Sequence, residues 1–490
     1  MTYRPLLLVL AASTALAGCN LAPKYVRPLG AVPAALPTGG VYPTAPTDAP
    51  DVTKIGWRDF FTDDRLRQVI QTGLDNNRDL QLAAANVLQA RAQYRVQRAD
   101  IVPTTSVSGS ATYTNNAFGA TGSTGGVGAG TGTGTGVGTG VTTGGSSSNL
   151  EIYSANVGFS AFELDLFGRI RNLNKAALEQ YFASEEAQRS TRISLIAEIA
   201  TAWATMAADQ DQLKLSRETL KAFEQTLNLT RAQFRIGVAS ELESRQAETN
   251  YQSARNDIAV LQTRIAQDQN ALNLLVGTTV PANLLPAALG DGNVTIQTLP
   301  GNLTSDVLLR RPDVLGAEHK LIAENANIGA ARAAFFPTIS LTATLGTIST
   351  ALGSLFGAGS GTYTASPSVS LPLFDGGRNK GNLDYARASQ KAAVATYEKT
   401  IQTAFREVAD ALAQRGTIDE QLNAQLARAE AARVAARLSD ARYRAGVDSF
   451  LTSLDAQRTA YAVQQQLVTT RASRTSNLVE LYRSLGGGLD

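Results

Sequence analysis

The residues best suited to chemistry are scarce: among 490 residues there is one cysteine, Cys19, and one histidine, His319. A disulfide within the chain is impossible, and a metal site built from histidine and cysteine would lack ligands. His319 lies in the helical stretch 317–320, where we expect a packing or surface role rather than ligation. No arrangement of carboxylates or serines supports catalysis. The sequence therefore predicts no catalytic site, no metal site and no bound cofactor.

The chemistry that Cys19 could support is acylation. Arg4 precedes a short apolar run, which ends in Leu16-Ala17-Gly18-Cys19. Such a segment is typical of a secretory signal and is too short for a membrane span. Its end resembles a bacterial lipobox, in which the chain is cut before the cysteine and lipid is joined to it. We expect residues 1–18 to be removed and Cys19 to carry the lipid; an ordinary signal with an incidental cysteine is the alternative.

The residue after the cysteine bears on location. Asn20 stands where an aspartate usually means retention in the inner membrane, so the lipoprotein resemblance indicates the outer membrane. No later stretch has about 18 consecutive apolar residues. Any crossing of the membrane would therefore use strands.

Composition narrows the class of protein further. Basic and acidic residues number 44 and 42, for a net charge of +2, which gives no reason to expect a nucleic-acid partner. Apolar residues make up 43% of the chain but aromatic residues only 6%. Small side chains suit closely packed helices better than one large globular core.

The chain contains an internal repeat. Residues 232–240 match 441–449, and residues 98–104 match 332–338, with the matches in the same order throughout. Such self-similarity indicates two copies of one structural unit. The predicted organisation is a signal peptide at 1–18, a lipidated extended segment at 19–56, a first repeat at 57–300 and a second repeat at 301–490.

Each repeat contains a predicted β-hairpin, at about 103–166 and 337–374. In the second, apolar residues from Ile339 to Leu345 alternate with Ser and Thr, so each class lines one face. An uncharged polar face opposite an apolar one suits strands between lipid and a watery lumen. A half-buried soluble hairpin is the alternative. The Gly-, Thr- and Ser-rich stretch 114–149 predicts a flexible surface loop.

Each repeat also contains a predicted helical hairpin, at about 170–276 and 380–485. The first helix of each, about 170–236 and 380–445, has no proline and would reach roughly 100 Å. Leucines spaced by seven, such as Leu213, Leu220 and Leu227, indicate coiled-coil packing. Shorter helices are predicted at about 66–101 and 313–334.

The layout favours a conduit. Two hairpins give four strands, which cannot close a barrel, whereas open edges are excluded from lipid. Three copies would pool twelve strands, and the helices would continue the cylinder away from the membrane. A lipid-tethered structural or adhesive coiled-coil protein is the main competing class, although it does not explain the duplicated amphipathic hairpins.

The chain resembles the outer-membrane factor family of TolC-like efflux channels, and within it the NodT-type lipoproteins. The resemblance covers nearly the whole mature chain, and the segments that carry it are 57–63, 76–80, 308–314, 329–337, 443–449 and 454–457. It implies a mixed α/β, mainly α fold: a homotrimer with a twelve-stranded transmembrane β-barrel and a long periplasmic α-helical barrel. It further implies a passive, gated channel in the outer membrane that carries substrates onward from its partners. Those partners would be outer-membrane lipid, a periplasmic adaptor and an RND-type inner-membrane transporter.

The resemblance also implies two kinds of site. Leu451, Asp455 and Arg458 share one helix face and match residues that line the periplasmic constriction, so we expect a gate of three leucines and three aspartates. A simple surface pair between Asp455 and Arg458 is the alternative. The hairpin tips are expected to contact the adaptor, although they could be mere tight turns; their residues are Arg235, Gly237, Val238, Ser240, Arg444, Gly446, Val447 and Ser449.

Overall fold

The computed structural model describes residues 20–28, 30–43, 55–116, 148–289, 294–296 and 304–487. The predicted signal peptide, Cys19 and most of the predicted loop 114–149 lie outside these residues. The chain divides into two compact units, which are described separately. The first unit contains residues 95–175 and 326–386 with the chain up to Pro23, and the second contains the remaining segments from Lys24 onward.

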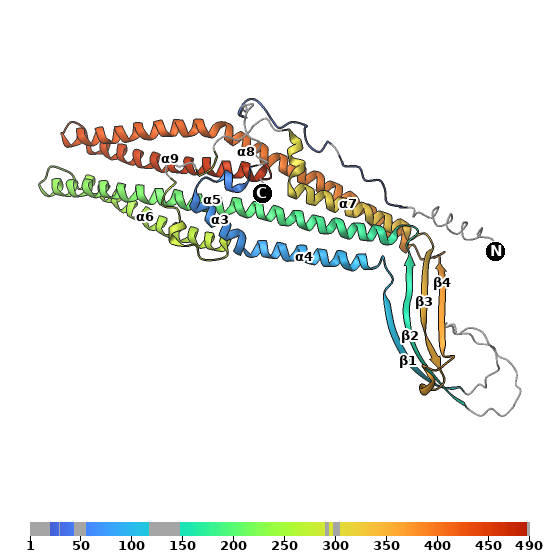
Figure 1. Cartoon of the computed structure of the whole chain (residues 1–490). Coiled ribbons are helices and arrows are strands. Elements are labelled where there is room, and N and C mark those ends of the chain that lie inside the picture. Colours follow the sequence, from blue (N-terminus) through green and yellow to red (C-terminus); the bar gives the residue numbers. More distant parts are fainter. Residues whose placement is uncertain are drawn as a thin grey trace. The chain divides into compact units, whose positions relative to one another are not determined.

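The first unit is built on one antiparallel sheet with the strand order β1-β2-β3-β4 (Figure 1). Each predicted hairpin supplies two neighbouring strands, and the β2–β3 pair joins the two repeats. The strands are β1 Thr105–Asn116, β2 Ser148–Leu164, β3 Thr338–Ser349 and β4 Gly361–Ser370. The second hairpin was predicted to end at about 374, but β4 ends at Ser370.

The pairing of β2 with β3 is interrupted by a bulge between Phe159 and Phe162. Ala161 lies in this bulge with φ at 53°, a left-handed conformation that is costly for a residue with a Cβ. Its backbone amide donates to Oγ1 of Thr342 on the neighbouring strand, at 3.0 Å. The bulge therefore remains hydrogen bonded.

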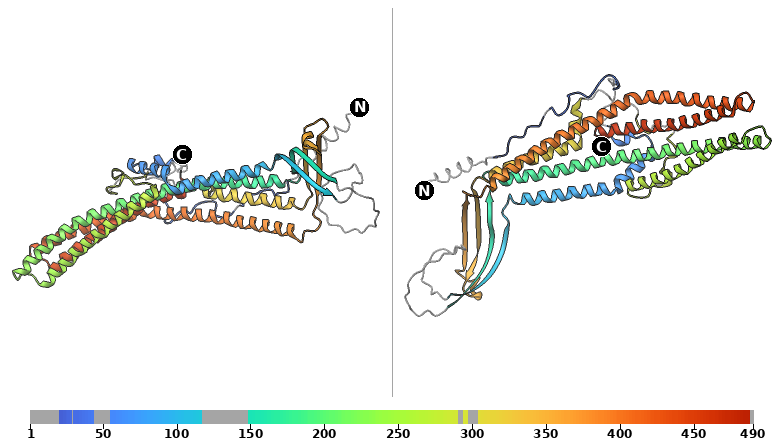
Figure 2. Two further views of the ribbon diagram at one scale, coloured as in Figure 1. Left: turned by 90° about the horizontal axis from the view of Figure 1, so that it is seen from below. Right: turned by 180° about the vertical axis from the view of Figure 1, so that it is seen from behind.

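Two long helical hairpins follow the strands. They are α5 Arg169–Arg235 with α6 Glu241–Val276, and α8 Arg378–Arg444 with α9 Phe450–Ser484. Within the second unit, each pair lies side by side in the views of Figures 1 and 2. α5 and α8 contain 67 residues each, which corresponds to about 100 Å of helix. Their ends fall within two residues of the predicted ones.

The single helix predicted at 66–101 is in fact two helices, α3 Asp64–Asn76 and α4 Arg78–Ala99. Asn77 separates them in an extended conformation. Its side-chain oxygen accepts from the amide of Leu80, and its side-chain amide donates to the carbonyl of Leu275, each at 2.8 Å. The asparagine thus caps the second helix and binds the end of α6, which local sequence periodicity does not reveal.

The short helix of the second repeat, α7 Pro312–Ala333, agrees with the prediction. At its start, the guanidinium of Arg311 binds the carboxylate of Asp313 at 2.7 Å. Arg311 also binds Glu407 and the carbonyl of Ser484, and therefore fastens α7 to α8 and α9. The remaining short helices are α2 Trp57–Phe60, η2 Ala282–Leu284, η3 Ser305–Arg310 and η4 Leu352–Ser354.

The largest side chains gather in one core of the second unit. Phe60 stacks on Tyr482 with ring centroids 4.1 Å apart, and Phe61 packs edge-on against Phe60. Trp203 is buried, and its indole nitrogen donates to the carbonyl of Leu284 at 3.1 Å. Alanine dominates the rest of the buried stripe on α5, as the composition predicted for closely packed helices.

Candidate functional site

The sheet presents an exposed apolar face. Val107, Val157, Leu345 and Tyr363 lie opposite one another across all four strands. Between 47% and 83% of each side chain is exposed. A row of large apolar side chains across a whole sheet is costly in water but favourable against lipid. This face favours a membrane position over a half-buried soluble hairpin.

The opposite face of the sheet carries cross-strand pairs of hydroxyl groups. The Oγ atoms of Ser110 and Ser154 lie 2.8 Å apart, and those of Ser340 and Ser368 lie 2.7 Å apart. These pairs satisfy one another between adjacent strands without adding charge. Such a surface can line an aqueous passage.

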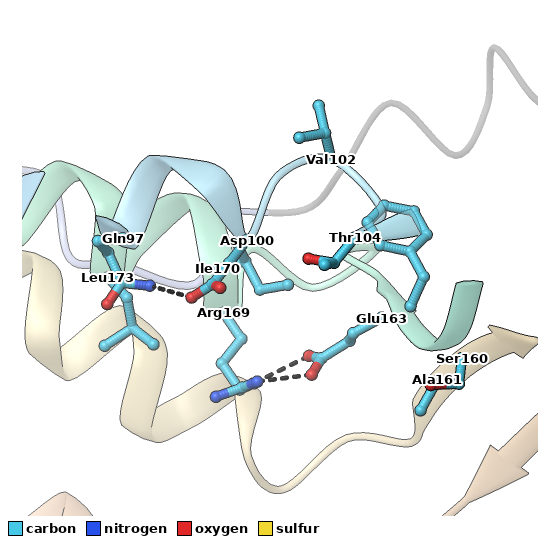
Figure 3. A pocket seen from close by; sticks show the side chains of 11 residues that line it. Gln97, Asp100, Val102, Thr104, Ser160, Ala161, Glu163, Arg169, Ile170 and Leu173 are labelled. Atoms are coloured by element: carbon cyan, nitrogen blue, oxygen red, sulfur yellow. Dashed lines mark hydrogen bonds and ion pairs between the residues drawn. The ribbon is translucent and has the colours of Figure 1, made fainter. Parts of the chain in front are cut away.

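A polar hollow of about 390 Å³ opens in the first unit beside the bulge of β2 (Figure 3). Nε of Arg169 donates to Oε1 of Glu163 at 2.9 Å, which ties the start of α5 to the end of β2. Gln97 donates to Asp100 at 2.8 Å at the end of α4. Arg169 and Glu163 thus join α5 to β2, and Asp100 is bonded within the end of α4, which fits a structural role.

The two hairpin tips have the same backbone design. Gly237 and Gly446 have φ of 79° and 71°, a region that favours glycine. Val238 donates to the carbonyl of Gln233 at 2.9 Å, and Val447 donates to that of Arg442 at 3.0 Å. Each glycine amide donates a second bond, from Gly237 to the carbonyl of Phe234 and from Gly446 to that of Tyr443. These two bonds form the pattern by which a left-handed glycine ends a helix. The valines remain exposed at 73% and 63%.

Each returning helix begins at the predicted serine. Ser240 accepts from the amide of Glu243, and the Glu243 carboxylate accepts from the amide of Ser240 at 3.0 Å. Ser449 accepts from the amide of Thr452 but has no such reciprocal partner. The first tip therefore has a complete capping box and the second only half of one.

The tips also differ in their charges. Arg442 grips Asp448 with two hydrogen bonds of 2.6 and 2.8 Å, and this pairing lowers the pKa of the Asp448 carboxyl. Gln233 and Ala239 stand at the equivalent positions of the first tip. Tyr443 links the two tips by donating to Oε1 of Gln233 at 2.7 Å.

The predicted gate residues share an exposed face at the start of α9. Leu451 is 53% exposed, and Asp455 and Arg458 are also exposed. In the part of the chain that the structure describes, Asp455 and Arg458 make no ion pair with each other. The three side chains therefore lie exposed on one face of α9.

The predicted lipidation site, Cys19, lies outside the described residues, but the next residue is well fixed. Oδ1 of Asn20 accepts from the amide of Ala22 and from Nδ2 of Asn172, each at 3.0 Å. The carbonyl of Leu21 accepts from Arg332 at 3.1 Å. The chain directly after Cys19 is thus bound to α5 and α7 within the first unit.

His319 occupies a packing position, as predicted. Its Nδ1 lies 2.7 Å from Oε2 of Glu179, and its ring lies 5.4 Å from that of Phe182. Among the residues that the structure describes, no group of three or more His, Cys, Asp or Glu side chains could hold a metal ion. Within the same residues, no helix has both the length and the apolar character of a membrane span.

Sequence reasoning missed a carboxyl pair inside the first hairpin. Asp209 on α5 and Asp268 on α6 approach within hydrogen-bond contact. Burial, and then the neighbouring Asp209, raise the pKa of Asp268 to about 6. A signal was available, because Ala247, Ala254 and Leu261 are buried at intervals of seven and Asp268 is the next member.

A sheet with an exposed apolar face, joined to long helical hairpins, defines a class of outer-membrane channel proteins. The chain belongs to the outer membrane efflux protein family, whose model matches residues 69–278 and 303–487. The predicted fold class, mixed α/β and mainly α, is confirmed. The predicted efflux-channel function and outer-membrane location are confirmed as well.

Similar proteins support this assignment over almost the full length. The chain is 46% identical to the probable efflux pump outer membrane protein TtgC of Pseudomonas putida, over 96% of this chain and 93% of the relative. A crystal structure of a membrane protein from Pseudomonas aeruginosa is 38% identical, covers 96% and 98% of the two chains, and has a TM-score of 0.84. The open state of the MtrE outer membrane channel of Neisseria gonorrhoeae is 34% identical, covers 96% and 99%, and has a TM-score of 0.83.

Proposed function

We propose that the chain forms, as a homotrimer, a passive gated conduit of a tripartite efflux system. It would receive substrates from a periplasmic adaptor and an RND-type inner-membrane transporter and release them outside the cell without chemical change. The observation that carries this proposal is the four-stranded sheet with one exposed apolar face and one polar face.

The sheet also supports the number of copies. Among the described residues, β1 and β4 each pair with one strand only, so both edges have unpaired backbone groups. Unpaired backbone groups cost several kcal/mol each in lipid. Pairing β1 of one copy with β4 of the next removes both edges. Three copies give twelve strands, enough for an open lumen, whereas one copy gives too few to close.

The test is to purify the protein in detergent, measure its mass, and reconstitute it in planar bilayers. We expect a trimer that conducts ions when the expected gate at Leu451 and Asp455 is weakened by mutation. A lipid-tethered coiled-coil protein would give no discrete conductance in either form, and that result would overturn the proposal.

We further propose that Leu451, Asp455 and Arg458 form the closed end of the conduit. Three-fold symmetry would bring three copies of each near the axis. The leucines would exclude water, and the carboxylates would attract cations. Like charges brought together are unfavourable unless each pairs with an arginine or a cation. The exposure of all three side chains on one face supports this arrangement.

The hairpin tips are the proposed adaptor contact. They expose Val238 and Val447 on rigid turns, and neither valine is needed to fill the core of its own hairpin. Arg235, Ser240, Arg444 and Ser449 would form the polar margin of the contact. A rigid, exposed turn presents a constant shape and loses little conformational entropy on binding.

The lipid anchor at Cys19 completes the proposal. Cys19→Ser should abolish incorporation of labelled fatty acid, because the thiol is the acceptor of the lipid. The wild-type protein treated in parallel serves as the control. Undiminished labelling of the variant would exclude Cys19 as the acceptor.

A further inference from the structure

An extended segment near the N-terminus is fastened along the helices of the second unit. It comprises residues 24–28 and 30–43, called the strap here, and is the dark blue trace beside α7 and α8 in Figures 1 and 2. The carbonyl of Ala34 accepts from the amide of Ser305 at 3.1 Å, and Leu36 is only 3% exposed. The strap is therefore part of the packed structure.

The strap is locked to α7 by an ion pair. Arg27 donates to both carboxylate oxygens of Glu318, at 2.8 and 2.7 Å, and Tyr25 donates to the same carboxylate at 3.0 Å. Glu318 is 7% exposed. A buried carboxylate is unfavourable without partners, and here the strap supplies three donors. Release of the strap would leave Glu318 without them.

The strap meets α8 at a glycine. A Cβ at Gly416 would overlap the carbonyl oxygen of Val41 and lie 2.9 Å from its carbonyl carbon. Glycine is unfavourable inside a helix, so its presence in the middle of α8 is explained by this close approach. The equivalent residue of α5 is Ala207, which is buried in the core.

These contacts divide α8 into two parts. The strap reaches α8 at Gln402, which donates to the carbonyl of Ala31 at 3.4 Å, and at Gly416. The part of α8 from Gly416 to its end at Arg444 is about 40 Å long, and among the described residues no hydrogen bond joins it to the strap. Leu451 and Asp455 follow directly beyond that end.

We propose that the strap sets the pivot of the second hairpin at Gly416 and thereby holds the gate closed. This inference rests on the proposed gate at Leu451 and Asp455. If the strap leaves Gly416, the next contact that holds α8 from outside its hairpin is the ion pair of Glu407 with Arg311, and the length of helix beyond it is about 55 Å. The same bending angle at the pivot then moves the tip of the second hairpin, with Leu451 and Asp455, over a larger distance. Gly416 and Arg27 are therefore positioning residues that act through the gate.

The test compares two glycine substitutions in the same helix. Gly416→Ala adds a Cβ that overlaps the backbone of the strap at Val41, so the strap must move away. Gly381→Ala adds the same atom where nothing lies within 4 Å. Hydrogen exchange of residues 30–43 measures release of the strap, and single-channel recording measures opening. We expect Gly416→Ala to speed exchange and to raise open probability severalfold, and Gly381→Ala to do neither.

A second variant protects the test if Gly416→Ala fails to assemble. Arg27→Gln with Glu318→Gln removes the ion pair without leaving a buried charge, and it should also raise open probability. Faster exchange with unchanged opening in either variant would overturn the inference and reduce the strap to a stabilising segment. Failure of the proposed function is distinguishable, because a gate variant such as Asp455→Ala would then show no discrete conductance.

Discussion

The two helical hairpins share a backbone but differ in side chains. α5 and α8 have 67 residues each, and both end at a left-handed glycine followed by an exposed valine. At several positions inside each hairpin and beside its tip, however, the two copies contain different residues. The backbone hydrogen bonds of the turn repeat in both, so the duplication has preserved the shape of the turn while the surface around it diverged.

One difference between the hairpins lies in their interiors. Where the first has the carboxyl pair of Asp209 and Asp268, the second has Ile418 and Asn477, both 2% exposed. Asn477 donates to the carbonyl of Ala411 at 2.9 Å and so joins α9 to α8. An apolar contact and a neutral hydrogen bond do not change with pH between about 4 and about 8, whereas a carboxyl pair does.

The largest expected effect concerns the gate, which the second hairpin alone is proposed to form. Leu451→Ser with Asp455→Ala removes a hydrophobic contact and a cation site, so open probability should rise about tenfold for each 1.4 kcal/mol by which the closed state is destabilised. Block by multivalent cations should fall. Single-channel recording is the measurement.

The first hairpin provides the matched control for the gate. Leu242→Ser with Gln246→Ala changes the equivalent positions and should leave conductance as in the wild type. Equal effects of the two double variants would show that the hairpins share the constriction, and no effect of either would place the gate elsewhere.

The next effect concerns the adaptor contact at the tips. Gly446→Trp and Gly237→Trp each place a large side chain where nothing lies within 4 Å, at a strain of about 1–2 kcal/mol from the left-handed backbone. Crosslinking to the adaptor should fall severalfold while the trimer persists. Gly359→Trp, in the β3–β4 connection, introduces the same strain in equally open space and should not affect crosslinking.

A smaller effect concerns the carboxyl pair. The raised pKa of Asp268, about 6, means that the folded state binds a proton more tightly than the unfolded state. Stability should therefore fall as the pH rises from about 4 to about 6, and stay lower above that range. Asp268→Asn should raise the free energy of unfolding by about 1 kcal/mol at pH 8, once solvent screening is allowed for, and not at pH 4. The thermal midpoint should rise accordingly at pH 8 only.

The reciprocal substitution sharpens this comparison. Asn477→Asp places a carboxyl at the equivalent position of the second hairpin, and it should lower the thermal midpoint at pH 8. Circular dichroism of the helices follows both variants. If Asp268→Asn shifts the midpoint equally at both pH values, the carboxyl pair does not titrate as inferred.

The smallest effect concerns the ion pair of the second tip. Arg442→Gln removes the two hydrogen bonds to Asp448, and the tip should exchange its amide hydrogens faster with little change in the thermal midpoint. The protection that this ion pair gives to the tip amides should disappear as the pH falls through the lowered pKa of Asp448, because the protonated carboxyl no longer attracts Arg442. Gln233→Arg with Ala239→Asp should transfer the same protection to the first tip; unchanged exchange in both variants would count against the pair.

Much of the fold follows from the sequence because it is encoded locally. Heptads, a glycine turn and a serine cap lie within a few residues of one another, so both long hairpins and their tips could be predicted. The break at Asn77 could not, because it depends on a hydrogen bond to Leu275, which is 198 residues away. The strap has no periodicity at all, and its partners Glu318 and Gly416 are distant in the chain.

The sites divide in the same way. The positions of Leu451, Asp455 and Arg458 on one exposed face followed from helical spacing, and the structure agrees. Whether these side chains meet around a three-fold axis depends on how the copies of the chain assemble. The helical spacing within one copy does not determine that assembly. The carboxyl pair depended on the register between α5 and α6, and this register emerges only when the buried heptad is extended to Asp268.

The equal length of α5 and α8 restricts how such a protein can change in evolution. The tips meet through the hydrogen bond between Tyr443 and Gln233, so both helices must arrive at the same level with the same rotation. Loss of one residue from α8 alone would turn the rest of that helix by about 100° and withdraw it by about 1.5 Å. We therefore expect insertions and deletions to be tolerated in steps of seven residues, about 10 Å, made in both hairpins together. A lineage facing a wider or narrower gap between its two membranes would adapt by such paired steps.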